Sequence, residues 1–560
     1  MSNARTDASP ASQPTSTDWV KLKGTFHQIC RRLAKRMWSD PVIIMGLLLV
    51  AGLVHGLQMT VTPSLLTTDD EGTYVAQAWA ILYKGVLAHY TYWMDHPPGG
   101  WIQMAGWAWL TRAFDRYDSA IAVGREFMLV ANLASVTLLY LLAKRLGMNK
   151  FFSIGAVALF ALSPLAVYTH RLTFLDNIAI PWVLAAFLLA ASPRNRLAAV
   201  IGSAVCFGVA VMTKETILVI LPALLWQLYQ GTHPRTRKMS FALWSTFFVS
   251  VGAVYILMAN LKNELLPGPG HVDLLYAIRW QLFDRASSGS IFDPTSTARL
   301  ILHSWARLDP WLIGMAVAFA LPALLRRRLR PVTLAFIIQI AVMLRPGGYL
   351  PQPYVIALIP FAALIVAGAV GALWNSGLLN RFHLLRNQIP RTGFSYAQVM
   401  VQAPALAIVT VFGLMIAVPQ WSPRLHDLMT DNRNVSVQQT MEWVDTHIPT
   451  KKGDASPVRI LVSDAMWVDL KRRGYAPDWY FKVDLDPAVK ANYPQGWQNV
   501  DYVIFTNEMN EIAKSDSRAD MTTTLASREH GTLVAHFGSL SEKIWIYQVK
   551  KPRRTSSGTG

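Results

Sequence analysis

Three consecutive carboxylates, Asp69, Asp70 and Glu71, are the first residues of this sequence whose types and spacing could carry out chemistry. They follow the first apolar stretch and begin a segment that is compatible with a helix as far as Tyr83. A carboxylate held in place can take a proton from a hydroxyl group, which is general-base chemistry. The same acids can also stabilise a helix amino terminus, by about 0.3–1 kcal/mol, so an acidic helix cap explains them equally well.

A second polar cluster lies further along the same loop, where Asp95 and His96 precede the turn Pro97-Pro98-Gly99-Gly100. A carboxylate beside an imidazole can act as an acid–base pair or bind a divalent ion. His271, in a later loop, could complete such a metal site with either residue. A capped turn and a solvent-exposed loop histidine remain simpler explanations for these residues.

Cations and acids also mark the ends of three later apolar stretches. Arg171 and Asp176 lie in the run Arg-Leu-Thr-Phe-Leu-Asp-Asn, and they could simply pair with each other. Lys214 directly precedes Glu215, its possible partner in an ion pair at the interface, and Arg345 precedes a Pro-Gly-Gly turn as a possible interfacial anchor. A cation at such a position can instead hold a phosphate group. Because ionisable groups at span ends are costly unless paired or hydrated, these clusters predict a shared polar cavity.

The composition identifies the elements that must position these residues. The chain has 560 residues, of which 52% are hydrophobic and 15% charged, and its mean hydropathy is +0.28. A soluble domain usually carries more charge, so a bilayer must supply part of the solvent. The net charge of +18 comes from short Lys and Arg clusters between apolar runs, which favours a positive-inside topology over nucleic-acid binding. The two cysteines, Cys30 and Cys206, are not placed for a disulfide or a metal site.

About eleven stretches have the apolar composition of a membrane span, which needs about 20 residues when fully exposed to lipid. We therefore predict a polytopic α-helical membrane protein. The Trp-rich run 101–110 is too short for a span and predicts a helix at the membrane interface. The predicted spans are 41–61, 120–142, 151–169, 177–191, 197–212, 216–229, 240–261, 311–325, 332–344, 354–374 and 403–418.

The basic loops orient these spans in the membrane. With the amino terminus in the cytoplasm, every predicted inside loop carries Lys or Arg, as the positive-inside rule requires. The same topology places the loops 62–119 and 262–310 outside, together with the chain after residue 420. We thus predict a multi-pass protein of the plasma (inner) membrane with a cytoplasmic basic segment (1–40), a transmembrane domain (41–420), an extracytoplasmic domain (421–549) and a flexible tail (550–560).

The predicted extracytoplasmic domain has a different pattern from the rest of the chain. Polar helical sequence at 435–446 is followed by short β-like runs at 459–463, 500–505 and 544–549. Such alternation is typical of a sheet covered by helices. We therefore expect a small soluble α/β domain at the carboxyl end.

Four motifs, in order, resemble the GT-C superfamily of integral membrane glycosyltransferases. The resemblance is to the branch of protein O-mannosyltransferases and lipid A aminoarabinose transferases, and it covers residues 41–229. The motifs are an acidic pair with an aromatic residue (Asp70, Glu71 and Tyr74), a His-Pro-Pro turn (96–98), an Arg…Leu-Asp-Asn run (171–177) and a Gly…Thr-Lys-Glu segment (208–215).

The resemblance implies a hexosyl- or pentosyltransferase that moves a monosaccharide from a polyprenyl-phosphate donor to a hydroxyl of an extracytoplasmic acceptor. The acceptor would be a cell-envelope glycan, a lipid or a protein. Asp70 aligns with the first acid of the family's pair and is the expected base, with Glu71 and Asp69 as its catalytic neighbours. The expected substrate-binding residues are Tyr74, Asp95, His96, Arg171, Asp176, Lys214 and Arg345.

The resemblance also bears on cofactors. Some relatives use a divalent metal ion and others do not, so a metal held by Asp95, His96 or His271 stays open. A nucleotide cofactor is not expected, because the donor is a lipid phosphate. The sequence agrees, since it contains neither a phosphate-binding P-loop motif nor a dinucleotide-binding glycine motif.

A polytopic secondary transporter or lipid flippase is the alternative, because intramembrane charges and many spans are natural there too. Against it, the acids crowd into an outside loop rather than the membrane midplane, and a large soluble outer domain is unusual for carriers. A receptor or purely structural protein would not need recessed acids.

Overall fold

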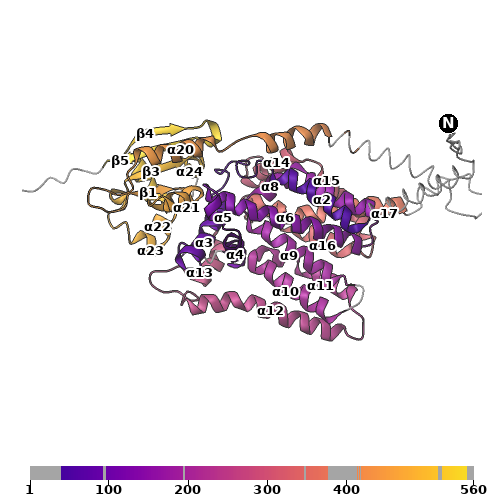
Figure 1. Cartoon of the computed structure of the whole chain (residues 1–560). Coiled ribbons are helices and arrows are strands. Elements are labelled where there is room, and N and C mark those ends of the chain that lie inside the picture. The colour runs from indigo at the N-terminus through magenta and orange to yellow at the C-terminus, as the bar shows by residue number, and fades with distance from the viewer. Residues whose placement is uncertain are drawn as a thin grey trace, which may run out of the picture.

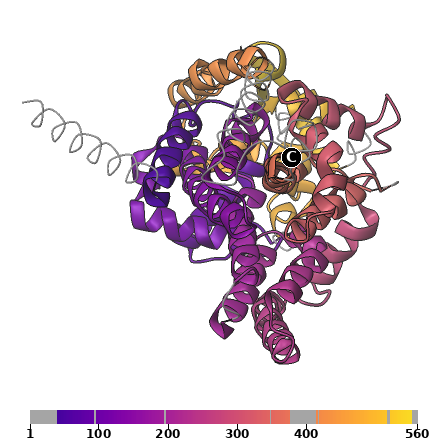
Figure 2. The same ribbon diagram turned by 90° about the vertical axis from the view of Figure 1, so that its right-hand side faces the viewer.

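The computed structural model describes residues 39–91, 96–192, 196–345, 348–375, 413, 415, 418–514 and 520–550. These residues form a helical bundle that meets a smaller sheet-containing part at one end (Figure 1). After a 90° turn, the yellow C-terminal elements lie behind the bundle, and an orange helix lies at its upper edge (Figure 2). The bundle and its loops contain α2 (Asp40–Gly56), α3 (Asp70–Lys84), α4 (Gly99–Thr111), α5 (Ala113–Arg116), α6 (Ala120–Arg145), α7 (Lys150–Leu162), α8 (Pro164–Arg171), α9 (Leu175–Ala190), α10 (Leu197–Thr213), η1 (Glu215–Ile220), α11 (Leu221–Gly231), α12 (Arg237–Leu261), α13 (Leu274–Arg279), η2 (Trp280–Asp284), α14 (Thr297–Leu308), α15 (Leu312–Leu324), α16 (Arg330–Met343), η3 (Gln352–Tyr354) and α17 (Val355–Asn375).

Several helices have the length and composition of membrane spans. Of the described helices, Ala120–Arg145, Arg237–Leu261 and Gln352–Ala372 can each cross a membrane alone, and the bent pairs α7–α8 and α14–α15 can each form one more span. Helices α2, α9, α10 and α16 are apolar but shorter. A helical multi-pass membrane protein is thus supported, whereas the count of about eleven spans of about 20 residues stays a prediction. The predicted span 403–418 lies almost wholly outside the described residues.

The bend between α7 and α8 has a local cause. Pro164 is the first residue of α8, and Ser163 before it has an extended backbone (φ −60°, ψ 127°), so the helix cannot continue through this point. The two helices are inclined by 59°. Helix α8 begins at this break and ends at Arg171, which is the first residue of the run predicted to contribute to the site.

The core of the bundle is built around α9, which contacts α6 and α10. Its Phe187 is fully buried and meets Phe361 of α17 edge to face, with ring centroids 5.4 Å apart. Helix α12 packs against α10 on the outside of the bundle (Figure 1) and leaves many apolar side chains exposed, as a lipid-facing helix does. The predicted interfacial run 101–110 forms most of α4, which contacts α3 and α10.

The sheet-containing part, which we name the α/β segment, covers residues 435–549. Its five strands have the order β2-β1-β3-β5-β4; β1 is parallel to β2 and β3, and β5 is antiparallel to β3 and β4. Its elements are α20 (Val435–His447), β1 (Arg459–Val462), α21 (Asp464–Arg472), β2 (Ala476–Trp479), α22 (Lys482–Leu485), α23 (Pro487–Lys490), η5 (Gly496–Asn499), β3 (Tyr502–Thr506), α24 (Asn507–Ile512), α25 (Thr522–Glu529), β4 (Gly531–Phe537), η7 (Leu540–Glu542) and β5 (Ile544–Val549).

The sequence predicted part of this arrangement. The helix at 435–446 and the three β-like runs correspond to α20, β1, β3 and β5. Strand β2 was missed because it has only four residues and contains Pro477. Helix α21 packs against α3, which brings the α/β segment over the acidic run that begins α3.

Candidate active site

The three adjacent acids have three different environments. Asp70 is the first residue of α3 and is partly exposed, and its backbone N–H donates to Thr68 Oγ1 at 3.2 Å. Asp69 is 5% exposed and Glu71 is fully buried. The side chains of Asp69 and Glu71 are held by partners from different parts of the chain. Three acids that are equivalent in the sequence therefore have different surroundings in the fold.

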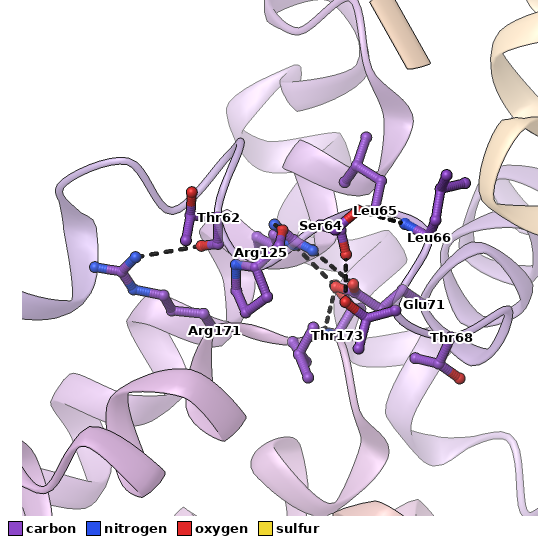
Figure 3. Close-up of polar contacts among 12 residues, drawn as sticks. Thr62, Ser64, Leu65, Leu66, Thr68, Glu71, Arg125, Arg171 and Thr173 are labelled. Atoms are coloured by element: carbon purple, nitrogen blue, oxygen red, sulfur yellow. Dashed lines mark hydrogen bonds and ion pairs between the residues drawn. The ribbon is translucent and has the colours of Figure 1, made fainter. Parts of the chain in front are cut away.

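Glu71 forms a buried ion pair with Arg125 of α6 (Figure 3). The guanidinium donates twice to the carboxylate, from Nη2 to Oε1 at 2.6 Å and from Nε to Oε2 at 2.9 Å. Oε2 also accepts the backbone N–H of Thr173 at 2.8 Å, and Arg125 donates to the carbonyls of Met59 and Pro63. Glu71 therefore ties together the first loop, α6 and the run that follows α8, while its predicted catalytic role stays a prediction.

Asp69 is held by the α/β segment. Ser463 donates its hydroxyl to Oδ1, and the indole of Trp479 donates to Oδ2 at 3.1 Å. Burial and the nearby charge of Asp464 raise the pKa of Asp69 to about 6, while the bonds from Ser463 and Trp479 act in the opposite direction. Asp69 is thus held by hydrogen bonds from the α/β segment, and Asp70 beside it is the one of the three acids that is partly exposed.

Lys214, His96 and Glu215 form a polar chain on the bundle side. Lys214 Nζ lies 3.0 Å from His96 Nε2, and His96 Nδ1 lies 3.0 Å from Glu215 Oε2. Since a lysine ammonium can only donate, Nε2 accepts and the imidazole proton belongs on Nδ1. Lys214 and His96 are 7% and 8% exposed. The sequence placed these residues in separate motifs, and the fold brings them into contact.

Local packing explains how His96 reaches Lys214. Gly99, at the start of α4, lies so close to the carbonyl of Met212 in the last turn of α10 that a β-carbon would collide with it. Gly100 packs equally closely against Leu175 of α9. The turn with two prolines and two glycines therefore seats the amino end of α4 on α10, directly beside Lys214.

Asp70, Tyr74 and Asp176 complete the site. The ring of Tyr74, one turn after Asp70 on α3, lies 6.0 Å from the ring of His96. The carboxylates of Glu215, Asp176 and Asp70 all lie close enough to the Lys214 ammonium for their charges to act on it. The fold thus brings a partly exposed carboxylate within electrostatic reach of a buried ammonium.

A recess adjoins this region on the bundle side. Asp176 lines it together with Thr216 of η1, Gln339 of α16 and Tyr354. Asp176 itself is 4% exposed, and the fold therefore buries it at the wall of this recess. The sequence signalled Asp176, but it gave no reason to include Gln339 or Tyr354.

Arg171 lies away from the polar chain and binds backbone carbonyls. Its Nη1 donates to Thr62 and Leu428, and its Nη2 donates to Val54 and Leu57 at 2.7 and 2.8 Å (Figure 3 shows the contact with Thr62). Both terminal nitrogens are therefore engaged, and neither pairs with Asp176. A contact of Arg171 with a phosphate stays a prediction, and the geometry favours a role in joining α2, the first loop and the chain before α20.

The remaining predicted residues are more peripheral. Arg345 is exposed at the end of α16, close enough to Tyr354 for its charge to act on that phenol. His271 is a loop residue whose ring nitrogens lie 3.3 and 3.4 Å from carbonyls of Pro269 and Leu266. Asp95 lies outside the described residues.

The residues predicted to bind a metal do not form a ligand cluster in the described part of the chain. His96 is engaged at both nitrogens by Lys214 and Glu215, and His271 contacts its own loop. Among residues with a described position, no group of three His, Cys, Asp or Glu side chains could hold an ion. A metal at Asp95 stays a prediction.

Sequence reasoning missed Arg125 and Ser463, and it did not connect Trp479 with Asp69. The only signal for Arg125 was a charged residue within a predicted span, which is rare unless the charge is paired or functional. Ser463 and Trp479 are ordinary strand-end residues, so nothing in their local sequence connects them with Asp69.

The chain was compared with known proteins. The sequence profile of the family "Dolichyl-phosphate-mannose-protein mannosyltransferase" matches residues 95–260. This match includes His96, Arg171, Asp176, Lys214 and Glu215. Among curated protein sequences, none matches significantly.

Solved structures show the same fold over most of the chain. ArnT from Cupriavidus metallidurans, bound to undecaprenyl phosphate, is 16% identical with a TM-score of 0.55; the match covers 91% of this chain and 98% of that one. The oligosaccharyltransferase of Archaeoglobus fulgidus in its apo form is 13% identical with a TM-score of 0.51, covering 90% and 75%. AglB from the same organism, in complex with an inhibitory peptide and a dolichol-phosphate, is 12% identical with a TM-score of 0.50, covering 91% and 74%.

These findings support the resemblance that the sequence motifs indicated. The similarity to the solved structures concerns the fold, and the family match covers the segment that carries three of the motifs. The chain therefore has the fold of the GT-C membrane glycosyltransferases, and its resemblance to their protein O-mannosyltransferase and aminoarabinose transferase branch is confirmed.

Proposed function

We propose that this protein transfers a monosaccharide from a polyprenyl-phosphate donor to a hydroxyl group of an extracytoplasmic acceptor. The observation that carries the proposal is that Asp70, a partly exposed acid, lies close enough to the buried Lys214 ammonium, which contacts His96, for the two charges to interact. The solved ArnT and AglB structures contain undecaprenyl phosphate and dolichol-phosphate, respectively, which supports a lipid phosphate as the donor class.

The proposed reaction uses the Asp70 carboxylate and the Lys214 ammonium. Asp70 accepts the proton of the acceptor hydroxyl as its oxygen forms a bond to the anomeric carbon of the sugar. The bond between that carbon and the phosphate oxygen breaks, and the departing polyprenyl phosphate gains negative charge. Lys214, oriented by His96, offsets this charge without reorganisation because both side chains are already fixed.

The proposed orientation of the protein in the membrane follows from the charges of its loops. Basic inside loops place the amino terminus in the cytoplasm and the α/β segment outside, where lipid-linked sugars and envelope acceptors meet. The acceptor class stays open between a glycan, a lipid and a protein. The choice between a hexose and a pentose also stays open, as does the use of a divalent ion near Asp95.

Transfer by purified protein tests this proposal. The full chain in lipid nanodiscs is incubated with radiolabelled polyprenyl-phosphate sugars, one hexose and one pentose at a time, with cell-envelope glycan, lipid or protein fractions as acceptors. Label should move to one fraction, and Asp70→Asn should stop the transfer while undecaprenyl phosphate still binds. If no labelled donor is consumed and reconstituted protein instead moves a lipid or solute across vesicles, the transporter alternative replaces the proposal.

A further inference from the structure

The beginning of α3 is enclosed by the α/β segment rather than by the bundle alone. Ser463 follows β1 and caps α21, where its oxygen accepts the N–H of Ala465 at 3.2 Å. The same hydroxyl donates to Asp69, and Trp479 at the end of β2 donates to the second oxygen of that carboxylate. Residues at the ends of the neighbouring parallel strands β1 and β2 therefore both contact the carboxylate of Asp69.

Close backbone packing accompanies these hydrogen bonds. A β-carbon at Gly72, in the first turn of α3, would overlap with the backbone of Asp464 and Ala465 in α21. Glycine within a helix is less favourable than alanine by about 1 kcal/mol, so its presence has a cost that this contact explains. Helices α3 and α21 can approach this closely only because position 72 lacks a side chain.

Asp464 strengthens the same junction. Its Oδ2 accepts the hydroxyl of Thr73 at 2.8 Å and lies 3.2 Å from Nε2 of His89. The side chains of His89 and Asp464 are almost completely buried. The first turns of α3 and α21 thus share a buried polar contact beside the glycine.

A second contact fixes the α/β segment to the bundle at the other end of α21. Asp469 Oδ1 accepts the N–H of Ala120 at 2.8 Å, which is the first residue of α6. Arg472 donates to the carbonyls of Phe114 and Tyr117 at 2.7 and 3.1 Å. Because α6 also carries Arg125, the partner of Glu71, the acids on both sides of Asp70 are fixed to elements joined by α21.

We infer that the α/β segment positions the catalytic acid, with Ser463, Trp479 and Gly72 acting through Asp69 on the orientation of Asp70. The inference rests on the proposed function of Asp70. Asp69 is held from the α/β segment and Glu71 from the bundle, so the side chains of both residues that flank Asp70 are fixed. Ser463, Trp479 and Gly72 are positioning residues, because they act on the reacting carboxylate through Asp69 and α3.

Kinetics of conservative variants test the inference in the full chain. Ser463→Ala and Trp479→Phe remove one donor each with little change in shape, and each should lower kcat by about tenfold with unchanged donor KM. Ser463→Thr, which restores a hydroxyl, should recover most of the rate. Ser539→Ala, at an exposed serine of the same segment, is the matched control and should behave as the native protein.

A readout independent of catalysis separates this inference from the proposed function. Hydrogen exchange of the amides in the first turns of α3 should become about tenfold faster in Ser463→Ala and Trp479→Phe, but not in Ser539→Ala. Unchanged exchange in both variants, or a rise in donor KM with unchanged kcat, overturns the positioning role.

Gly72→Ala should have the largest effect of all; if it expresses with native exchange and native kcat, the inference is also overturned. If Asp70→Asn keeps full transfer while hydrogen exchange in α3 still becomes faster in Ser463→Ala and Trp479→Phe, the assignment of Asp70 as the base is wrong. The role of the α/β segment in holding α3 is then still supported.

Discussion

Glu71 and Arg125 form a bidentate ion pair whose side chains are completely buried, with Nη2 and Oε1 2.6 Å apart. Removing one partner of such a pair leaves an uncompensated buried charge, which typically costs about 3–5 kcal/mol. Arg125→Met should therefore lower the melting temperature strongly, as measured by thermal unfolding in detergent. Arg116→Met removes the more exposed pair with Glu126 and should cost at most about 1 kcal/mol. Equal melting temperatures for both variants would contradict this prediction.

The general-base role of Asp70 predicts a selective loss of turnover. Asparagine is nearly isosteric with aspartate but does not accept a proton at neutral pH, so Asp70→Asn should lower the transfer rate by about 10²–10⁴-fold with a native melting temperature. The measurement is transfer of labelled sugar from a polyprenyl phosphate. Loss of transfer only in Asp69→Asn would move the base one residue back, and near-normal transfer by Asp70→Asn would refute the assignment.

Lys214 is expected to bind the donor phosphate through its charge. Lys214→Met keeps most of the apolar stem but removes the ammonium, and a lost charge-assisted contact of about 1.5–3 kcal/mol corresponds to roughly 10–100-fold weaker binding. Binding of undecaprenyl phosphate to the purified protein measures this effect. Lys550→Met, at an exposed position after β5, is the control. Unchanged affinity of Lys214→Met would place the phosphate elsewhere.

Arg171 gives a prediction that distinguishes a joining role from phosphate binding. Because its terminal nitrogens donate to four backbone carbonyls, Arg171→Met should leave buried carbonyls without donors and reduce stability. The melting temperature should fall clearly, whereas affinity for undecaprenyl phosphate in the protein that remains folded should be native. Weaker phosphate binding at an unchanged melting temperature would instead support the contact with donor predicted from the motif.

Glu508 of α24, whose carboxyl group lies close enough to Asp69 and Asp70 for their charges to act on it, predicts a pH dependence of stability. Burial, followed by the charges of Asp69 and Asp70, raises the pKa of Glu508 well above its ordinary value of 4.5. Between these two pKa values the folded protein binds more protons than the unfolded chain, so the free energy of unfolding falls as pH rises from 4.5 towards the folded pKa.

Glu508→Gln removes this proton equilibrium and should lose less stability than the native protein as pH rises over that window. Melting temperatures from pH 4.5 to 8 measure the difference. Glu511→Gln, at a largely exposed residue paired with Lys514, is the matched control and should follow the native curve. Parallel curves for the native protein and Glu508→Gln would show that the Glu508 pKa does not change on folding.

In the described part of the site, the contacts between charged side chains differ from those that the sequence suggested. The sequence suggested an ion pair between Lys214 and Glu215, whereas in the fold the His96 imidazole contacts both of these side chains. The fold does not join Arg171 with Asp176 either, because the Arg171 guanidinium instead donates to backbone carbonyls of α2, the residue after it, the first loop and Leu428. Local sequence gives the position of a charge along a helix, whereas its partner depends on how the helices pack.

The sequence by itself determined the membrane class, the helix that begins at Asp70 and the order of the charged motifs, because hydropathy and local propensity are properties of neighbouring residues. The types of Asp69, Asp70 and Glu71 alone could not separate them, and only the resemblance to the family favoured Asp70 as the base. The tertiary structure decided their surroundings, since Glu71 is paired with a residue 54 positions away and Asp69 with residues 394 and 410 positions away. Contacts at such separations arise from packing of α3 against α6 and α21, and they leave Asp70 as the accessible acid of the three.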